Sequence, residues 1–427
     1  MKIIRCILKK RRLPGIFLAT FFIFLISLSM RVFAEKPIVV VLDPGHGGEN
    51  LGALYNGYVE KDMNLIVARA MKEELEKYEH IRVYLTHEDE DMSLKERAEF
   101  AAAKKADFLF SLHFNMSETH MLYGTEVWIS AFDTFYAKGH AFGQIQMAAY
   151  QEMGLFSRGI KTRIGKTDED YYGIIRESKK LGIDAILIEH CHLDHLVDQA
   201  FYALGDFQLE EFGQMTATSV AKFYQLKSSV LGVDYSDFPV PAVAVPTEAV
   251  RPDLTPPDLC HIELISLDVD ERVAVFNLMA IDYDSRVLYY GISFDGGNNF
   301  EMLKIFPEGE SELTITVNLP PGKDLKVIAA AYNAYDRITE SNIIEIGALP
   351  SDVLEEIEEI LEDLEEMIDI SLTELTQTLT KSQEQMKQSL KAYQFIIIGI
   401  IALMVLLVMI VISRIFLFKR SKKRLTD

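Results

Sequence analysis

The sequence predicts an α/β domain with a mostly parallel sheet flanked by helices, followed by a small β-sandwich, a helical stalk and a C-terminal transmembrane helix. Residues 37–227 alternate short, nearly all-apolar runs with amphipathic stretches, the pattern of a parallel sheet covered on both faces. Residues 260–348 hold short apolar runs separated by turn signals, which favours antiparallel strands. An unbroken apolar run near the C-terminus is long enough to cross a bilayer as a helix.

Charge divides the chain in the same way. The 427 residues carry a formal net charge of −21, which argues against a nucleic-acid-binding protein because such proteins show a basic footprint. Residues 1–34 hold seven Lys or Arg and no acid, and residues 413–427 hold six Lys or Arg and one Asp, so residues 35–412 carry −33. An acidic segment between two basic ends indicates a protein that is inserted in or exported across a membrane.

Residues 1–34 match a secretory signal peptide. Six Lys or Arg within residues 2–12 are followed by the uncharged apolar run 13–30 and by Val32-Phe33-Ala34, so cleavage is expected after Ala34. The apolar run is long for a signal, and an uncleaved membrane anchor is the alternative. In either case the chain that follows leaves the cytoplasm.

Residues 395–418 predict a single transmembrane helix, since about 20 apolar residues span a bilayer. The basic tail 419–427 follows, and the positive-inside rule places it in the cytoplasm. The expected location is therefore the cell membrane, with residues 35–394 outside the cytoplasm.

Within residues 35–227, apolar runs predict strands at 37–42, 81–86, 107–113, 125–129 and 184–189, and amphipathic stretches predict helices at 62–78, 93–105, 139–153 and 209–225. Ligands of such sheets bind beyond the carboxyl ends of the strands.

Three segments follow this domain. Residues 228–259 contain six of the thirteen prolines and predict a stiff linker. Residues 260–348, called the β module below, predict an immunoglobulin- or fibronectin-like sandwich that serves as a spacer or partner-binding module. Residues 351–394 predict an acidic helical stalk, either solvated or paired as a coiled coil. The mature chain keeps Cys191 and Cys260, which favours two free thiols over one bridge.

Three potential zinc ligands fall at the ends of predicted elements. His46 follows the first strand in the segment DPGHGG, Glu60 stands just before the first helix, and His113 ends the third strand. Singly, each has an ordinary interpretation as a turn histidine, a helix-start carboxylate or a buried histidine. Together, on one side of a parallel sheet, they match the two-histidine, one-glutamate set of a catalytic zinc site.

The last strand adds a catalytic base. Its apolar residues 185–188 run into Glu189, and a buried carboxylate needs a partner or a metal-bound water. Zinc lowers the pKa of water to about 7, and a nearby carboxylate can accept the proton. The alternative is a metal site at His192 and His195. Strand alternation turns Glu189 away from residue 192. We therefore favour Glu189 as the base, and His192 as a residue that contacts either the substrate or a metal ligand.

Further motifs occur in a fixed order: Glu60-Lys61-Asp62-x-Asn64-Leu65, Leu94-x-x-Arg97, Ser111-Leu112-His113-x-Asn115, Gly124-x-Glu126-Val127 and Ser157-Arg158-Gly159-Ile160-Lys161. With these motifs, residues 37–225 resemble the catalytic domain of zinc-dependent N-acetylmuramoyl-L-alanine amidases, which are bacterial cell-wall hydrolases. The resemblance implies one Zn²⁺ held by His46, Glu60 and His113, with Glu189 as the catalytic carboxylate. It also implies cleavage of the amide between N-acetylmuramic acid and the L-alanine of the peptidoglycan stem peptide.

The chain departs from the family in two respects. After the catalytic Glu the family commonly shows Gly-Phe and then Asn, whereas Cys191-His192 and His195 stand here. The family also usually attaches to the wall through repeat or binding domains, whereas this chain ends in a predicted membrane span.

Candidate substrate contacts come from polar residues near the predicted site. Asn115, Arg158, Lys161 and Arg176 have side chains suited to stem-peptide carboxylates and amides, with His192 as a fifth candidate. Ordinary solvated surface charge is the alternative for the cations. The aromatic pair Tyr171-Tyr172 is a candidate wall of the cleft, with packing as the alternative.

The sequence therefore favours a membrane-anchored zinc amidase with peptidoglycan as its partner. A catalytically inactive scaffold for the cell wall, septum or sporulation is the alternative; it predicts a lost ligand or base, and all four residues are present. The linker, β module and stalk suggest presentation above the membrane to an activator or a septal or sporulation partner. Deleting residues 260–394 is expected to change location or control without abolishing activity on soluble fragments.

Overall fold

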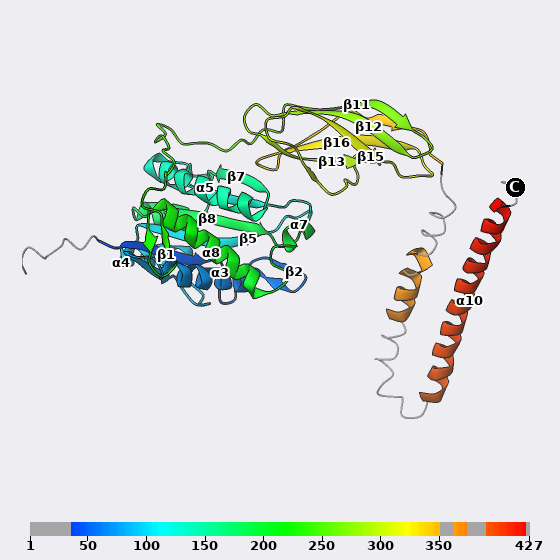
Figure 1. Ribbon diagram of the computed structural model, residues 1–427, viewed down its shortest axis with the longest axis horizontal. Coiled ribbons are helices and arrows are strands. Elements are labelled where there is room, and N and C mark those ends of the chain that lie inside the picture. The colour runs from blue at the N-terminus through cyan, green and yellow to red at the C-terminus, as the bar shows by residue number, and fades with distance from the viewer. Residues whose placement is uncertain (1–35, 351–361, 365, 374–389, 424–427) are drawn as a thin grey trace, which may run out of the picture. The chain divides into compact units, whose positions relative to one another are not determined.

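The computed structural model describes residues 36–350, 362–364, 366–373 and 390–423 (Figure 1). They separate into a first unit that ends at Gly347, apart from residues 320–323, and a second unit that holds the C-terminal helix. The predicted signal peptide, residues 1–34, lies outside the described residues.

A six-stranded sheet of order β4-β1-β5-β8-β6-β7 forms the centre of the α/β domain. Four strands are parallel, while β6 pairs antiparallel with β8 and carries β7 parallel to itself, so the predicted mostly parallel sheet is confirmed. The edge strand β7 was not predicted as a strand. The bounds are β1 Ile38–Pro44, β4 Ile81–Leu85, β5 Phe108–Asn115, β6 Thr125–Ile129, β7 Ser157–Thr162 and β8 Ala185–His192.

Helices cover both faces of this sheet (Figure 1). One face packs against α3 (Glu60–Leu75), α5 (Asp133–Met153) and α8 (Asp206–Phe223), and the other against α4 (Leu94–Lys104) and α6 (Gly173–Lys180). A capping box of Ser93 and Glu96 starts α4. Short elements complete the domain: β2 Leu54–Tyr55, β3 Tyr58–Val59, α7 Leu196–Gln199, β9 Lys227–Ser228 and β10 Val233–Asp234.

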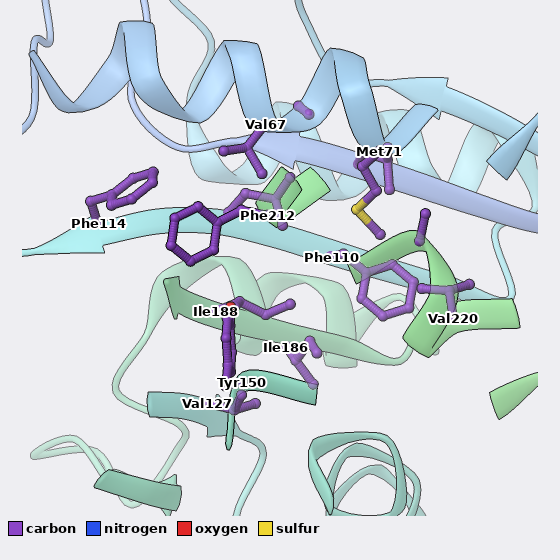
Figure 2. Packing of buried hydrophobic residues seen from close by; sticks show 14 of the residues in the cluster. Val67, Met71, Phe110, Phe114, Val127, Tyr150, Ile186, Ile188, Phe212 and Val220 are labelled. Atoms are coloured by element: carbon purple, nitrogen blue, oxygen red, sulfur yellow. The ribbon is translucent and has the colours of Figure 1, made fainter. Parts of the chain in front are cut away.

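Alternate strand residues feed two cores, because successive side chains in a strand point to opposite faces. Phe110, Ile186 and Ile188 join the core beneath α3, α5 and α8, whereas Leu109 and Leu187 join the core beneath α4 and α6. Figure 2 shows the first of these cores, with side chains from α3 and α8 meeting those of the strands. The central strands are therefore apolar on both faces, as the sequence pattern indicates.

The β module consists of two antiparallel sheets in the first unit. One sheet has the order β11-β12-β15 and the other β14-β13-β16-β17, with β18 also paired to β16. The strands are β11 Leu259–Asp268, β12 Val273–Ile281, β13 Val287–Ser293, β14 Lys304–Ile305, β15 Glu312–Asn318, β16 Leu325–Asn333, β17 Ile338–Glu340 and β18 Ile344–Ile346. Cys191 and Cys260 are buried free thiols, which confirms the predicted pair of unbridged cysteines.

The second unit contains the helix α10 (Leu390–Lys423). Its segment Ile397–Arg414 has a mean hydropathy of 2.8 and is long and apolar enough to cross a membrane. Residues 362–364 and 366–373 are also helical, and the rest of the predicted stalk up to residue 389 lies outside the described residues.

Candidate metal centre and active-site cleft

His46, Glu60 and His113 come together at the carboxyl ends of β1 and β5, at the start of α3. The two oxygens of Glu60 lie 3.0 Å from His46 Nε2 and 2.9 Å from His113 Nδ1. One potential ligand atom from each residue lies within 4.8 Å of the other two, and no other group in the described ranges converges in this way. The prediction that these three residues share a site is therefore matched by their geometry.

The donor set suits zinc, which binds histidine nitrogen and carboxylate oxygen. His46 Nδ1 lies 3.0 Å from the Oδ1 of Asn50, so this contact orients the ring and leaves Nε2 facing Glu60. The backbone N–H groups of Ala53 and Phe114 donate to the two oxygens of Glu60 at 2.8 Å and 3.2 Å. The carboxylate is thus held in place by the backbone before any metal binds.

Two glycines make room for these side chains. A Cβ on Gly45 would lie 2.3 Å from the His113 ring, and a Cβ on Gly52 would lie 2.5 Å from Glu60 Oε2. Gly52 also has a φ of +71°, a backbone conformation that L side chains rarely adopt. The close approach of backbone to ligand explains why glycine stands at both positions.

A buried ion pair holds the loop that carries His46. This residue has a φ of +67°, which costs free energy in a non-glycine residue and requires support from its surroundings. Arg97 donates to the carbonyl oxygens of Pro44 and His46 and pairs with Asp43 at 3.0 Å. The hydroxyls of Thr86 and Ser111 donate to the same Asp43 carboxylate. Both Asp43, in the DPGHGG segment, and Arg97, in Leu94-x-x-Arg97, belong to the sequence motifs, but no local pattern indicates that they pair.

Glu60 is held as a carboxylate by the histidines. Its burial opposes ionisation, but hydrogen bonds from His113 and His46 outweigh burial and keep the pKa of Glu60 well below its ordinary value. The same contact with Glu60 outweighs the burial of His46 and raises the pKa of that imidazole.

Glu189 is placed differently. It ends the apolar part of β8 directly opposite His113 of β5, and it lines the same cleft as the three ligands. Its Oε2 is buried and has no hydrogen-bond partner among the described residues. Burial, followed by the charges of Glu60 and Glu126, raises the pKa of Glu189 well above its ordinary value. An orphaned acceptor with a raised pKa beside a metal-ligand set is what a proton-accepting residue needs.

The cleft has a volume of about 600 Å³ and is open to solvent. Besides the ligands and Glu189, its wall includes Asn115, Tyr172 and Arg97, together with residues 91–93 of the loop before α4. Tyr172 packs against Trp128 with ring centroids 5.0 Å apart, so one of the two predicted aromatic wall residues lies in the cleft. The adjacent Tyr171 does not line the cleft.

The predicted substrate contacts divide into two groups. Asn115 lines the cleft, whereas the other four candidates do not. Arg158 and Lys161 are 1% and 2% exposed, and both pair with Glu126. Arg176 donates to the carbonyl oxygens of Asp170 and Tyr171, which lead into α6. A role for these three cations in substrate binding stays a prediction.

His192 is buried rather than displayed. Its backbone N–H donates to Asp198, and its Nδ1 lies 3.0 Å from the carbonyl oxygen of Gly124. His195 stacks on Tyr123 with ring centroids 4.6 Å apart. The alternative metal site therefore has no convergent third ligand among the described residues.

Comparison with known proteins assigns the domain. Residues 40–222 match the model of a family described as N-acetylmuramoyl-L-alanine amidase. This part of the chain belongs to the N-acetylmuramoyl-L-alanine amidase family. The match spans all six strands of the central sheet except the first residues of β1, and it contains His46, Glu60, His113 and Glu189.

Individual relatives of the amidase domain are partial matches. The probable N-acetylmuramoyl-L-alanine amidase AmiB of Haemophilus influenzae is 38% identical over 112 residues, which cover 26% of this chain and 26% of that protein. The N-acetylmuramoyl-L-alanine amidase LytC of Bacillus subtilis is 32% identical, covering 30% of this chain and 26% of that protein. The chain thus spans about a quarter of the length of these two relatives.

A solved structure of similar kind is the catalytic domain of CwlV, an N-acetylmuramoyl-L-alanine amidase from Bacillus (Paenibacillus) polymyxa var. colistinus. It is 27% identical, covers 44% of this chain and 99% of that one, and aligns with a TM-score of 0.38.

Proposed function

We propose that this protein is a zinc-dependent amidase that cleaves peptidoglycan between N-acetylmuramic acid and L-alanine from a membrane-anchored position. The single observation that supports this most is the convergence of His46, Glu60 and His113 in one cleft with the orphaned carboxylate of Glu189. The family match of the amidase domain favours the same reaction.

The residues present fit zinc, and each has a role in the proposed reaction. His46, Glu60 and His113 would hold the ion, which supplies Lewis-acid polarisation of a carbonyl and a lowered pKa for water when it is bound. Glu189 accepts a proton at Oε2 and can return it to the leaving amine. Asn115 and Tyr172 offer an amide and an aromatic face to the substrate across the cleft.

We further propose that α10 anchors the enzyme in the cell membrane. Its apolar segment is flanked on the C-terminal side by a basic tail, the arrangement expected for a helix that stops in the cytoplasm. The linker, β module and stalk would then present the amidase domain to the wall or to a protein partner. Full-length and α10-truncated forms should differ in membrane fractionation, and equal release of both into the soluble fraction would refute the anchor.

The activity is tested with full-length protein in detergent, loaded with zinc and mixed with purified sacculi and with soluble muropeptides. Wild type should release free stem peptides, while Glu189→Ala should keep its zinc and release none. His113→Ala should lose zinc and activity together. Wild type that retains zinc yet frees no stem peptide, with or without added partner fractions, would support the scaffold alternative instead.

Zinc binding has a readout of its own. Asn50 orients His46, and loss of such an outer contact typically lowers metal affinity by about 10- to 100-fold. We expect Asn50→Ala to weaken zinc binding to this degree in a chelator competition, while Asn50→Asp, which keeps the acceptor oxygen, stays close to wild type. Equal affinity of Asn50→Ala and wild type would show that the Asn50 contact does not support metal binding at His46.

A further inference from the structure

The edge strand of the amidase sheet is covered by the β module. An exposed sheet edge presents unpaired backbone groups, and proteins cover such edges. Here Arg286 of the β module donates to the Ser157 carbonyl oxygen of β7 at 3.0 Å, and the Tyr289 hydroxyl donates to the carbonyl oxygen of Tyr123. Tyr123 and Tyr289 also share an apolar cluster with Leu288 and Leu303. The two parts of the first unit therefore share buried side chains.

Arg158 of β7 lies at the centre of this junction and is 1% exposed. Its Nε donates to Glu126 of the amidase domain at 3.0 Å. Its other two nitrogens donate to the β module, to the Tyr289 hydroxyl at 3.2 Å and to the Asp336 carboxylate at 2.6 Å. A guanidinium offers its donors in a rigid planar fork, so the position of one partner constrains the others.

Glu126 connects this guanidinium to the cleft. It lies directly opposite Glu189 in the pairing of β6 with β8, while Glu189 lies opposite His113. One oxygen of Glu126 accepts from Arg158 and Lys161, and the other accepts from Asn115 at 2.9 Å and from Trp128 at 3.0 Å. Asn115 lines the cleft. A continuous path of hydrogen bonds thus runs from the β module to a cleft residue.

The contacts of Arg158 distinguish this arrangement from a passive spacer. A spacer needs no buried charge at its junction, because burying a charge is costly unless the partners satisfy it. Without the β module, two of the three donor groups of Arg158 would lack their partners and the edge of β7 would be open. Arg158 would then move toward solvent, and Glu126 and Asn115 would lose the geometry that it imposes.

We propose that the β module is a positioning element of the active site, with Arg158 as the positioning residue that couples its Tyr289 and Asp336 through Glu126 to Asn115. This inference rests on the proposed amidase function. It also reverses the expectation from sequence that the β module is dispensable for cleavage of soluble fragments. The β module would act on the chemistry itself, independently of where the protein sits in the cell.

The test uses the full-length, zinc-loaded protein in detergent and soluble muropeptides, for which location is irrelevant. The variant Tyr289→Phe with Asp336→Asn removes the hydroxyl of one β-module partner of Arg158 and the negative charge of the other. Asp336 has a φ of +61°, which Asn tolerates, so the backbone is preserved. The matched control, Tyr290→Phe with Asp270→Asn, makes the same chemical changes in the same module at a neighbouring strand position and an exposed loop.

We expect the double variant to lower kcat/KM by on the order of 10-fold, as small displacements of aligned groups do, with zinc content unchanged. The control should match wild type. A second measurement places both changes in an Asn115→Ala background. If the effect passes through Asn115, the double variant should cause little further loss there, because coupled residues are not additive.

Three other outcomes would each contradict one of the proposals. An equal further loss in the Asn115→Ala background would show general destabilisation and overturn the coupling. Activity of the double variant equal to the control would show that the β module is only a spacer. An inactive wild type would instead refute the proposed amidase function, so the two failures are distinguishable. Hydrogen exchange of β7 peptides gives a readout without turnover and should increase in the double variant alone.

Discussion

Glu189 and Glu126 lie side by side on neighbouring strands, directly opposite each other in the pairing of β8 with β6. Glu126 is buried and Glu189 is half-buried with its Oε2 enclosed, yet the surroundings shift the pKa values of the two carboxylates in opposite directions. Two cations, an amide and an indole N–H surround Glu126, and although burial opposes ionisation, the charges of Lys161 and Arg158 keep the pKa of Glu126 well below its ordinary value. Glu189 has an unpartnered oxygen and a raised pKa.

The difference teaches that burial alone does not decide what a carboxylate does. A fully satisfied carboxylate is a structural charge, because its oxygens have no capacity for a proton or a substrate. A carboxylate left unsatisfied costs free energy, and such a cost is typical of residues kept for function. The following experiments test this contrast, from the largest expected effect to the smallest.

The first is Glu189→Gln, which keeps the shape and removes the base. Turnover of muropeptides should fall by about 10²- to 10⁴-fold, the usual contribution of a general base, with zinc retained. In the zinc-free protein, the free energy of unfolding at pH 7 should rise, since a carboxylate with a buried and unpartnered oxygen is replaced by a neutral amide. Calorimetry beside the kinetic assay checks both, and a destabilised Gln variant would mean that Glu189 is paired after all.

The second is Glu126→Gln, the same change one strand away. It should lower the free energy of unfolding by about 3–5 kcal/mol, because Arg158 and Lys161 stay buried without their carboxylate. Chemical denaturation gives the value. A cost close to zero would indicate that the two cations reach water easily and that Glu126 resembles a surface group.

The third experiment measures how the contribution of Glu126 to the free energy of unfolding depends on pH. The pKa of Glu126 is lowered in the folded protein, so the unfolded chain binds a proton first, and the stabilisation is present above about pH 4.3 and lost as pH falls below it. The difference in free energy of unfolding between wild type and Glu126→Gln should therefore begin to narrow as the pH falls through about 5 and should keep narrowing at about pH 3 and below. A gap that stays constant would contradict an ionised Glu126.

The fourth experiment removes one partner of an exposed ion pair, so that its effect on stability can be compared with that of the buried pair. Arg69 and Glu88 form a bridge of 2.6 Å on the surface, where both side chains are more than half exposed. Glu88→Gln should change the free energy of unfolding by less than about 1 kcal/mol, and salt should reduce the effect further. A cost similar to that of Glu126→Gln would show that burial is not what makes the inner pair important.

Much of the site could be predicted from the chain. The glycines around His46, and the apolar runs that end in His113 and Glu189, place polar side chains at strand ends, and the ends of parallel strands meet at one edge of a sheet. Alternation along β8 was enough to separate Glu189 from His192, which is buried and does not line the cleft.

The cations could not be assigned in the same way. Arg158 and Lys161 belong to β7, a strand with too few apolar residues to be recognised, and their charge suggested solvent or substrate. Only the pairing of β7 beside β6 brings them to Glu126, and only the β module closes the junction over Arg158. No local pattern specifies that an acidic residue and a basic residue more than thirty positions apart will pair with each other.

The sequence by itself determined the order of the parts, the apolar layers of the sheet, the four residues at the proposed centre and the apolar segment of α10, because each depends on periodicity or on the ends of elements. Only the tertiary structure decided which polar side chains have all their hydrogen-bond and ion-pair partners and which keep an unpartnered atom. That choice depends on distances between segments remote in sequence, and it separates Glu189, with its unpartnered oxygen, from Glu126, whose oxygens are fully occupied.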